Sequence, residues 1–149
     1  MNEYTILDHI STTQGVRDIT RFDEVTQLVI ETTARHYQLS HEQLYSDSRI
    51  RPIPEARHFI FWAMTHRVDG RSFNQWYKWK VTIIGDIFGK DHTTVLHANK
   101  IISGLAQTSR EKYDLFEKIC RELFHRGYPD ALKKLQNIKR IHVNNSVWK

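Results

Sequence analysis

The chain has 149 residues, 40% of them hydrophobic and 11% aromatic, which is enough for a packed core and argues against a disordered protein. No apolar run reaches the length of a membrane span, no secretion signal is expected at the N-terminus, and the single cysteine, Cys120, excludes an intrachain disulfide. Residues 1–48 carry a net charge of −5, whereas residues 49–100 and 101–149 each carry +5, which favours a polyanionic partner.

The first helix is expected over roughly residues 21–37, after a loosely ordered arm at residues 1–19. Apolar residues recur at helical spacing from Phe22 to Tyr37, and Thr20-Arg-Phe-Asp23 resembles a capping box. A polar connection with two basic residues, Arg49 and Arg51, should then lead to the next helix.

That second helix should begin near Pro54, because proline suits the first turn of a helix, and should end near Gly70. Ser72-Phe-Asn-Gln75 is a capping box that predicts the start of a third helix, with an apolar face as far as Ile87. Gly89 should end this helix, and a short turn should lead directly into the next one. Two helices joined in this way form a helix-turn-helix.

The segment Gly89-Lys-Asp-His-Thr-Thr-Val-Leu-His-Ala98 carries the most functional information. It opens with the polar run Asp91-His-Thr-Thr94, and buried positions are expected to follow at Val95, Ala98 and Ile102. The pattern predicts a helix with an outward-facing tip and a packed body, as a helix that reads the DNA major groove requires.

Two more helices are expected towards the C-terminus. Ser109 can cap the first, whose apolar stripe includes Cys120, and Gly127 should end it. Pro129 should begin the second, with Lys133 and Lys134 on its surface. We therefore predict an all-α helical bundle with a helix-turn-helix. Its expected parts are an arm at 1–19, a DNA-binding domain at 20–105 and a C-terminal helical extension at 106–149.

The segment GKDHTTVLHA closely resembles the signature of the DNA-binding C-terminal domain of DnaA, the bacterial replication initiator. The resemblance spans roughly residues 22–105, and Ser48-Arg-Ile-Arg-Pro-Ile-Pro-Glu-Ala-Arg57 is similar to the family's basic loop. The chain departs from the family in having one glycine before Lys90 instead of two. It also has a longer aromatic stretch, Trp76-Tyr-Lys-Trp-Lys80.

The resemblance implies a protein that binds double-stranded DNA at specific sites, in replication initiation or its regulation or in transcription. We expect it in the cytoplasm, associated with the nucleoid. No phosphate-binding loop of the type GxxxxGK[S/T] occurs in the sequence, so the DNA-reading module is expected alone, without the family's ATPase. No enzyme activity, cofactor or metal is expected.

The expected contacts fall into three groups. Asp91, His92 and Thr93 should contact base edges; Lys90, Thr94, Arg57 and Lys100 should contact phosphates; and Arg49 and Arg51 should enter the minor groove.

Other interpretations stay open for the same residues. Asp91 could be an ordinary N-cap, Arg49 and Arg51 could belong to a solvated loop, and the aromatic stretch could be core, a platform for single strands or a protein interface. The alternative function is a phage or plasmid adaptor that binds a replication protein through its aromatic and C-terminal helices. A nuclease or transposase accessory has little support, because no cluster of carboxylates is apparent.

Overall fold

The computed structural model describes residues 16–65, 67–68, 71–72 and 81–138 of the chain. These residues form α2 (Val16–Tyr37), α3 (His41–Tyr45), α4 (Ile53–Met64), α5 (Val81–Gly85), the 3-10 helix η2 (Asp86–Phe88), α6 (His92–Thr108), α7 (Arg110–His125) and α8 (Asp130–Gln136). Two strands of two residues each, β1 (Arg67–Val68) and β2 (Arg71–Ser72), pair antiparallel after α4. The predicted all-α class is confirmed, with this small strand pair as a local addition. None of the described helices is long and apolar enough to cross a membrane.

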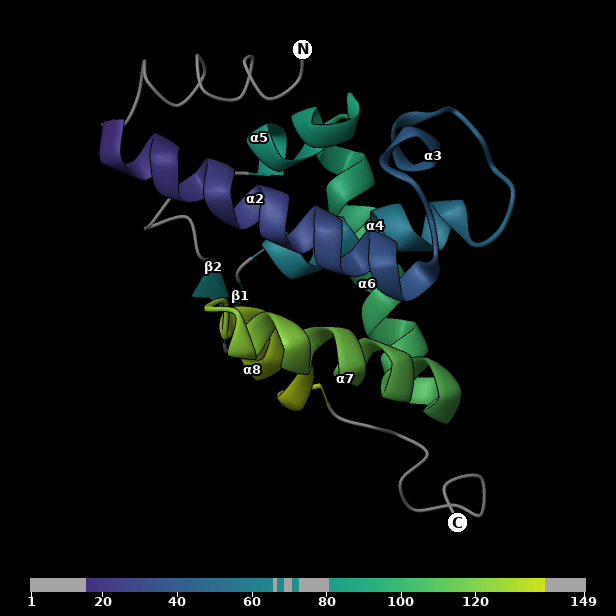
Figure 1. The fold of residues 1–149 in the computed structure, drawn as a ribbon. Helices are drawn as coiled ribbons and strands as arrows, with labels where there is room; N and C mark the ends of the chain where they lie inside the picture. The colour runs from purple at the N-terminus through teal and green to yellow at the C-terminus, as the bar shows by residue number, and fades with distance from the viewer. Residues whose placement is uncertain (1–15, 66, 69–70, 73–80, 139–149) are drawn as a thin grey trace.

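The centre of the molecule is α4, which is apolar on nearly all sides. Its last six residues, Phe59 to Met64, are at most 1% exposed, because helices surround them. A helix that is hydrophobic all round is stable only when it is enclosed in this way. Figure 1 shows α2 crossing in front of α4 and α6, with α7 and α8 below them. One hydrophobic cluster joins all of these helices with α3, α5 and η2.

Several predicted boundaries need correction. The first helix begins at Val16, so the resemblance of Thr20-Arg-Phe-Asp23 to a capping box was misleading: these residues lie inside α2. The second helix ends at Met64, earlier than predicted. The third is seen only from Val81 onward, and its predicted start at 72–75 and the aromatic stretch at 76–80 cannot be compared, because residues 73–80 lie outside the described residues. Residue 105, the predicted end of the DNA-binding domain, lies within α6, and α7 and α8 belong to the same hydrophobic cluster as the preceding helices. The division into domains stays a prediction.

The C-terminal helices are joined to α4 by a lysine expected on the surface. The ammonium group of Lys134 donates hydrogen bonds to the carbonyl oxygens of Trp62 at 2.7 Å and Thr65 at 2.6 Å. It also donates to Oδ1 of Asn99 on α6 at 2.6 Å and lies 4.8 Å from the centre of the Trp62 ring. A cation at a helix C-terminus satisfies carbonyls that have no partner within the helix and interacts favourably with the helix dipole. Lys134 therefore caps α4, and the surface position predicted for it is wrong.

Polar contacts also join α2 to α7 and α4. On α7, Glu122 accepts hydrogen bonds from Arg35 and His36 of α2, and the bond from Arg35 is the main cause that lowers the pKa of Glu122 to about 2. The Tyr37 hydroxyl donates to Glu55 of α4 at 2.6 Å. Burial raises the pKa of this tyrosine, and the bond to Glu55 adds to the effect. The long first helix is thus held at its C-terminal half.

Removing the cap on α4 should measurably destabilise the protein. Lys134→Met keeps most of the aliphatic stem but leaves the carbonyls of Trp62 and Thr65 without this donor, so we expect a loss of about 1–3 kcal/mol in the free energy of unfolding. Chemical denaturation followed by circular dichroism measures it. Lys133→Met, at the exposed neighbouring position, should change stability by less than about 0.5 kcal/mol. Equal effects of the two substitutions would contradict the capping role.

Candidate nucleic-acid interface

A tight turn connects η2 to α6. Gly89 adopts φ 67° and ψ 35°, a left-handed conformation that glycine accepts without steric cost, and its amide donates to the carbonyl of Asp86. The amide of Lys90 reaches back to the carbonyl of Gly85 at 2.8 Å. The turn therefore reverses the chain within a few residues and places the start of α6 beside the end of α5.

Gly85 is needed at this turn because of space and not because of its backbone angles. A Cβ atom at this position would lie 2.3 Å from the carbonyl oxygen of Lys90, closer than real Cβ contacts allow. The neighbour is backbone, so it cannot move aside without shifting the turn and the tip of α6. The role of Gly85 was not predicted, although a glycine within a helical pattern is a signal of such a close approach.

The tip of α6 is organised by Asp91, which is the N-cap of the helix. Its Oδ1 atom accepts hydrogen bonds from the Thr93 hydroxyl at 2.7 Å, the Thr94 amide at 3.1 Å and the Thr94 hydroxyl at 3.2 Å. These bonds, the one from the Thr93 hydroxyl first, lower the pKa of Asp91. The side chain is therefore an ionised acceptor at neutral pH.

One face of α6 remains open beyond this tip. The exposed side chains are His92, Thr93, Leu96, His97 and Lys100, which recur at helical spacing, while Val95, Ala98 and Ile102 are fully buried on the opposite side. Leu96 is 40% exposed, which is unusual for a leucine within an otherwise polar face. The outward tip and packed body predicted for this helix are both observed. Leu96 and His97 were not predicted to belong to this exposed face.

Arg57 supports the basic loop from the interior of the protein. The sequence had predicted a surface position for this residue, from which it would contact phosphate. Its side chain is buried, and Nε donates to the carbonyl of Leu44 at 2.7 Å. Nη2 donates to the carbonyls of Ser46 and, at 3.1 Å, Ser48. Burial lowers the pKa of this guanidinium. Arg57 thus fixes the path of the loop, while Arg49 and Arg51 are exposed on it.

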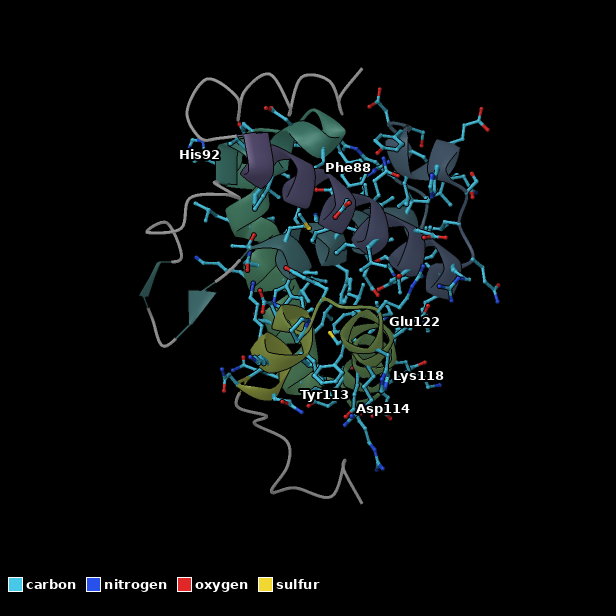
Figure 2. The ribbon with its side chains drawn as sticks, turned by 60° about the vertical axis from the view of Figure 1, so that its left-hand side comes forward. Phe88, His92, Tyr113, Asp114, Lys118 and Glu122 are labelled. Carbon is cyan, nitrogen blue, oxygen red and sulfur yellow. The ribbon has the colours of Figure 1, made fainter. Side chains whose placement is uncertain are left out.

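Contacts between aromatic rings bring the loop and the tip of α6 to the same end of the molecule. The ring of Tyr45, at the end of α3, lies 5.1 Å from that of Phe88, three residues before Asp91. Phe88 in turn packs against Phe61 of α4 at 5.5 Å. Figure 2 shows Phe88 and His92 at one end and the labelled residues of α7 towards the other. Apart from Arg57, which is part of α4, the predicted contacts therefore lie on two neighbouring segments: the loop after α3, and α6 with the turn before it.

Helix α3 was not predicted from the sequence, because its residues were assigned to a polar connection. Ser40 accepts from the amide of Gln43 at 3.0 Å, and the Gln43 side chain accepts from the amide of Ser40 at 2.8 Å. This is a complete capping box, and its pattern, Ser40-His-Glu-Gln43, is visible in the sequence. Leu44, fully buried, then anchors the short helix in the core.

Comparison with known proteins gives a consistent result. Residues 26–102 match the family model described as the bacterial dnaA protein helix-turn-helix. Among similar proteins named chromosomal replication initiator protein DnaA, the one from Rhizobium johnstonii is 33% identical over 107 residues, which is 68% of this chain and 19% of that protein.

The corresponding protein from Dechloromonas aromatica is 37% identical over 76 residues, or 50% of this chain and 14% of its own length. The protein from Tropheryma whipplei is 29% identical over 98 residues, which is 66% of this chain and 19% of that protein. The chain thus spans about a fifth or less of the length of these relatives. No solved structure matches it.

Two glycines allow a matched test of the turn. Gly85→Ala should lower the free energy of unfolding by about 1–3 kcal/mol or more, because the added methyl overlaps the Lys90 carbonyl. Gly104→Ala, within α6, meets nothing within 4 Å and should instead stabilise the protein by about 0.5–1 kcal/mol through helix propensity. Urea denaturation of both variants measures the difference. A Gly85→Ala variant as stable as Gly104→Ala would show that the turn is not tightly packed.

Proposed function

The chain belongs to the bacterial DnaA helix-turn-helix family, and on this premise we propose that it binds double-stranded DNA at specific sequences, in replication initiation or its regulation. The observation that carries the proposal is the tip of α6: an exposed polar run, Asp91 to Thr94, fixed by a tight turn and followed by a buried helix body. A major-groove reading helix needs this arrangement, because only an exposed tip on a rigid support reaches base edges.

The roles we propose follow from the chemistry of each exposed group. His92 donates to a base acceptor, and Thr93, whose hydroxyl is engaged by Asp91, offers its methyl to a thymine methyl. Asp91 accepts from a cytosine or adenine amine through Oδ2, since the hydrogen bonds among the described residues go to Oδ1. Lys90 lies at the positive end of the helix dipole and binds phosphate, and Lys100 binds a phosphate further along. Thr94 binds phosphate when its hydroxyl turns from Oδ1 of Asp91 to a phosphate oxygen, while its amide keeps the cap.

A second contact is proposed for the loop between α3 and α4. Arg49 and Arg51 are exposed and lie on a loop anchored beside the tip of α6, so they can enter the minor groove next to the major groove that α6 occupies. Arg57 contributes mainly by holding this loop, and any phosphate contact it makes uses the N–H groups not bound to loop carbonyls.

The second candidate function is that of an adaptor for a replication protein. The described observation in its favour is the large apolar side chain of Phe124, which is 47% exposed in the last turn of α7. A single exposed aromatic residue is common on protein surfaces. The DNA-binding proposal therefore takes precedence.

The direct test is selection of bound sequences from a random duplex library, followed by salt titration on the selected site. We expect one enriched motif and a fall in affinity of about tenfold to a thousandfold between low and moderate salt, because phosphate contacts release counterions. If all duplexes bound equally at physiological salt, site-specific recognition would be excluded. A protein that bound no duplex at all would leave the adaptor as the better proposal.

Substitutions at the tip of α6 should separate specificity from affinity. His92→Ala and Thr93→Ala should each cost about 1–3 kcal/mol at the selected site and much less on random duplex, because they remove base contacts. Asp91→Asn preserves the N-cap through its amide oxygen but places an amide donor where Oδ2 stood, so it should weaken binding at the selected site and much less on random duplex. By contrast, Lys90→Ala and Lys100→Ala should weaken all sequences alike and reduce the salt slope by roughly one unit each. Fluorescence anisotropy with both duplexes distinguishes the two patterns.

A further inference from the structure

The loop between α3 and α4 presents an apolar side chain between its two arginines. Ile50 is 73% exposed, more than Tyr45 at 47%, Leu96 at 40% or Phe124 at 47%, the other large hydrophobic side chains exposed in the described part of the chain. Arg49 and Arg51 on either side of it are also exposed. A single exposed isoleucine is common on protein surfaces and needs no explanation. An exposed isoleucine between two cations on an anchored loop suggests a ligand with an anionic surface and an apolar interior.

The backbone around Ile50 is fixed, although its side chain is free. Its amide donates to the Ser48 hydroxyl at 3.1 Å, and its carbonyl accepts from the amide of Ile53 at 2.9 Å. Arg57 holds the carbonyls of Ser46 and Ser48 just before it. The loop is therefore a rigid support for the isoleucine, so contact at this position would require little further ordering.

The direction of this loop is set by its contact with the end of η2. Because Tyr45 packs on Phe88, the chain from Ser46 to Pro52 starts beside the turn that carries the tip of α6. A duplex whose major groove receives α6 therefore brings an adjacent groove to the loop. The minor groove combines a negative surface, which suits Arg49 and Arg51, with stacked base steps, which accept an apolar wedge.

We propose that Ile50 is a minor-groove wedge: its side chain enters between base pairs at the step contacted by Arg49 and Arg51 and bends the DNA towards the major groove. The inference rests on the proposed DNA binding and adds to it a residue that acts on DNA shape. Insertion separates stacked bases, and the lost stacking is offset by burial of the isoleucine and by phosphate contacts that the bent duplex brings within reach. Specificity at this base step then comes from how easily the DNA sequence there can be bent.

The test measures bending separately from binding. Donor and acceptor dyes at the two ends of a duplex of about 30 base pairs report the bend by energy transfer, and anisotropy on the same duplex reports affinity. With the whole chain and the selected site, we expect a bend of roughly 20–90°. Ile50→Ser should reduce the bend and weaken binding about tenfold, as expected for loss of a buried isoleucine. Ile50→Met, which stays apolar, should retain most of both.

Two further variants separate the wedge from other effects. Phe124→Ser removes an exposed apolar group on α7 and should leave bend and affinity unchanged. Ile50→Lys replaces the apolar side chain by a cation. If position 50 only lies near phosphate, this variant should bind DNA more tightly; if Ile50 is a wedge, the variant should bend the DNA less than the parent chain. Because Ile50 is exposed, each variant should keep the melting temperature of the parent, which circular dichroism checks.

The outcomes distinguish the wedge from the function on which it rests. If the parent chain binds its site but leaves the DNA straight, or if Ile50→Ser bends it equally, the wedge is overturned and the proposed DNA binding stands. If the parent chain binds no duplex, the proposed function fails and the wedge fails with it. A smaller bend with Ile50→Ser and Ile50→Lys, but not with Ile50→Met, supports the wedge.

Discussion

The complete burial of α4 is the constraint on which the rest of the structure depends. Six consecutive apolar residues with no exposed side must be covered by several helices, and α2, α6 and α8 all pack on them. Polar side chains link the two ends of this helix to the neighbouring segments. Near the N-terminal end Arg57 turns outward from the helix to bind the carbonyls of the preceding loop, and at the C-terminal end Lys134 binds the last carbonyls of the helix itself. The loop on one side and the C-terminal helices on the other are therefore positioned by the same buried segment.

The elements that follow a local pattern could be predicted from the sequence. The tip and buried body of α6, the cap at Ser109 and the end of α7 at Gly127 all depend on residues near one another in the chain, and the structure confirms them. The roles that depend on tertiary contact could not. Lys134 resembles any surface lysine until α8 is placed against α4, and Arg57 resembles a free cation until its loop is folded over it.

Two omissions had a visible signal. The pattern Ser40-His-Glu-Gln43 is a capping box, but the helix after it is only five residues long and was obscured by the polar residues around it. Gly85 stands among apolar residues, where glycine is unfavourable for a helix unless close packing requires it. The Ser40–Gln43 capping box and Gly85 both lie near the proposed DNA-binding end. A short helix and a short turn stand there, and neither is long enough to show a regular hydrophobic period. The sequence therefore predicted the reading helix better than the supports that position it.

The two interpretations of Asp91, as a helix cap and as a base contact, need not compete. A carboxylate has two oxygens, and the cap engages Oδ1 with the amide of Thr94 and the hydroxyls of both threonines. Because these bonds lower its pKa, the group stays ionised at neutral pH and acts only as an acceptor. The bond that anchors Thr93 to Asp91 also limits the rotation of that threonine, so the cap orders the side chains proposed to touch the bases. An N-cap in this position supports recognition, because a reading tip that is already rigid loses less entropy when it binds.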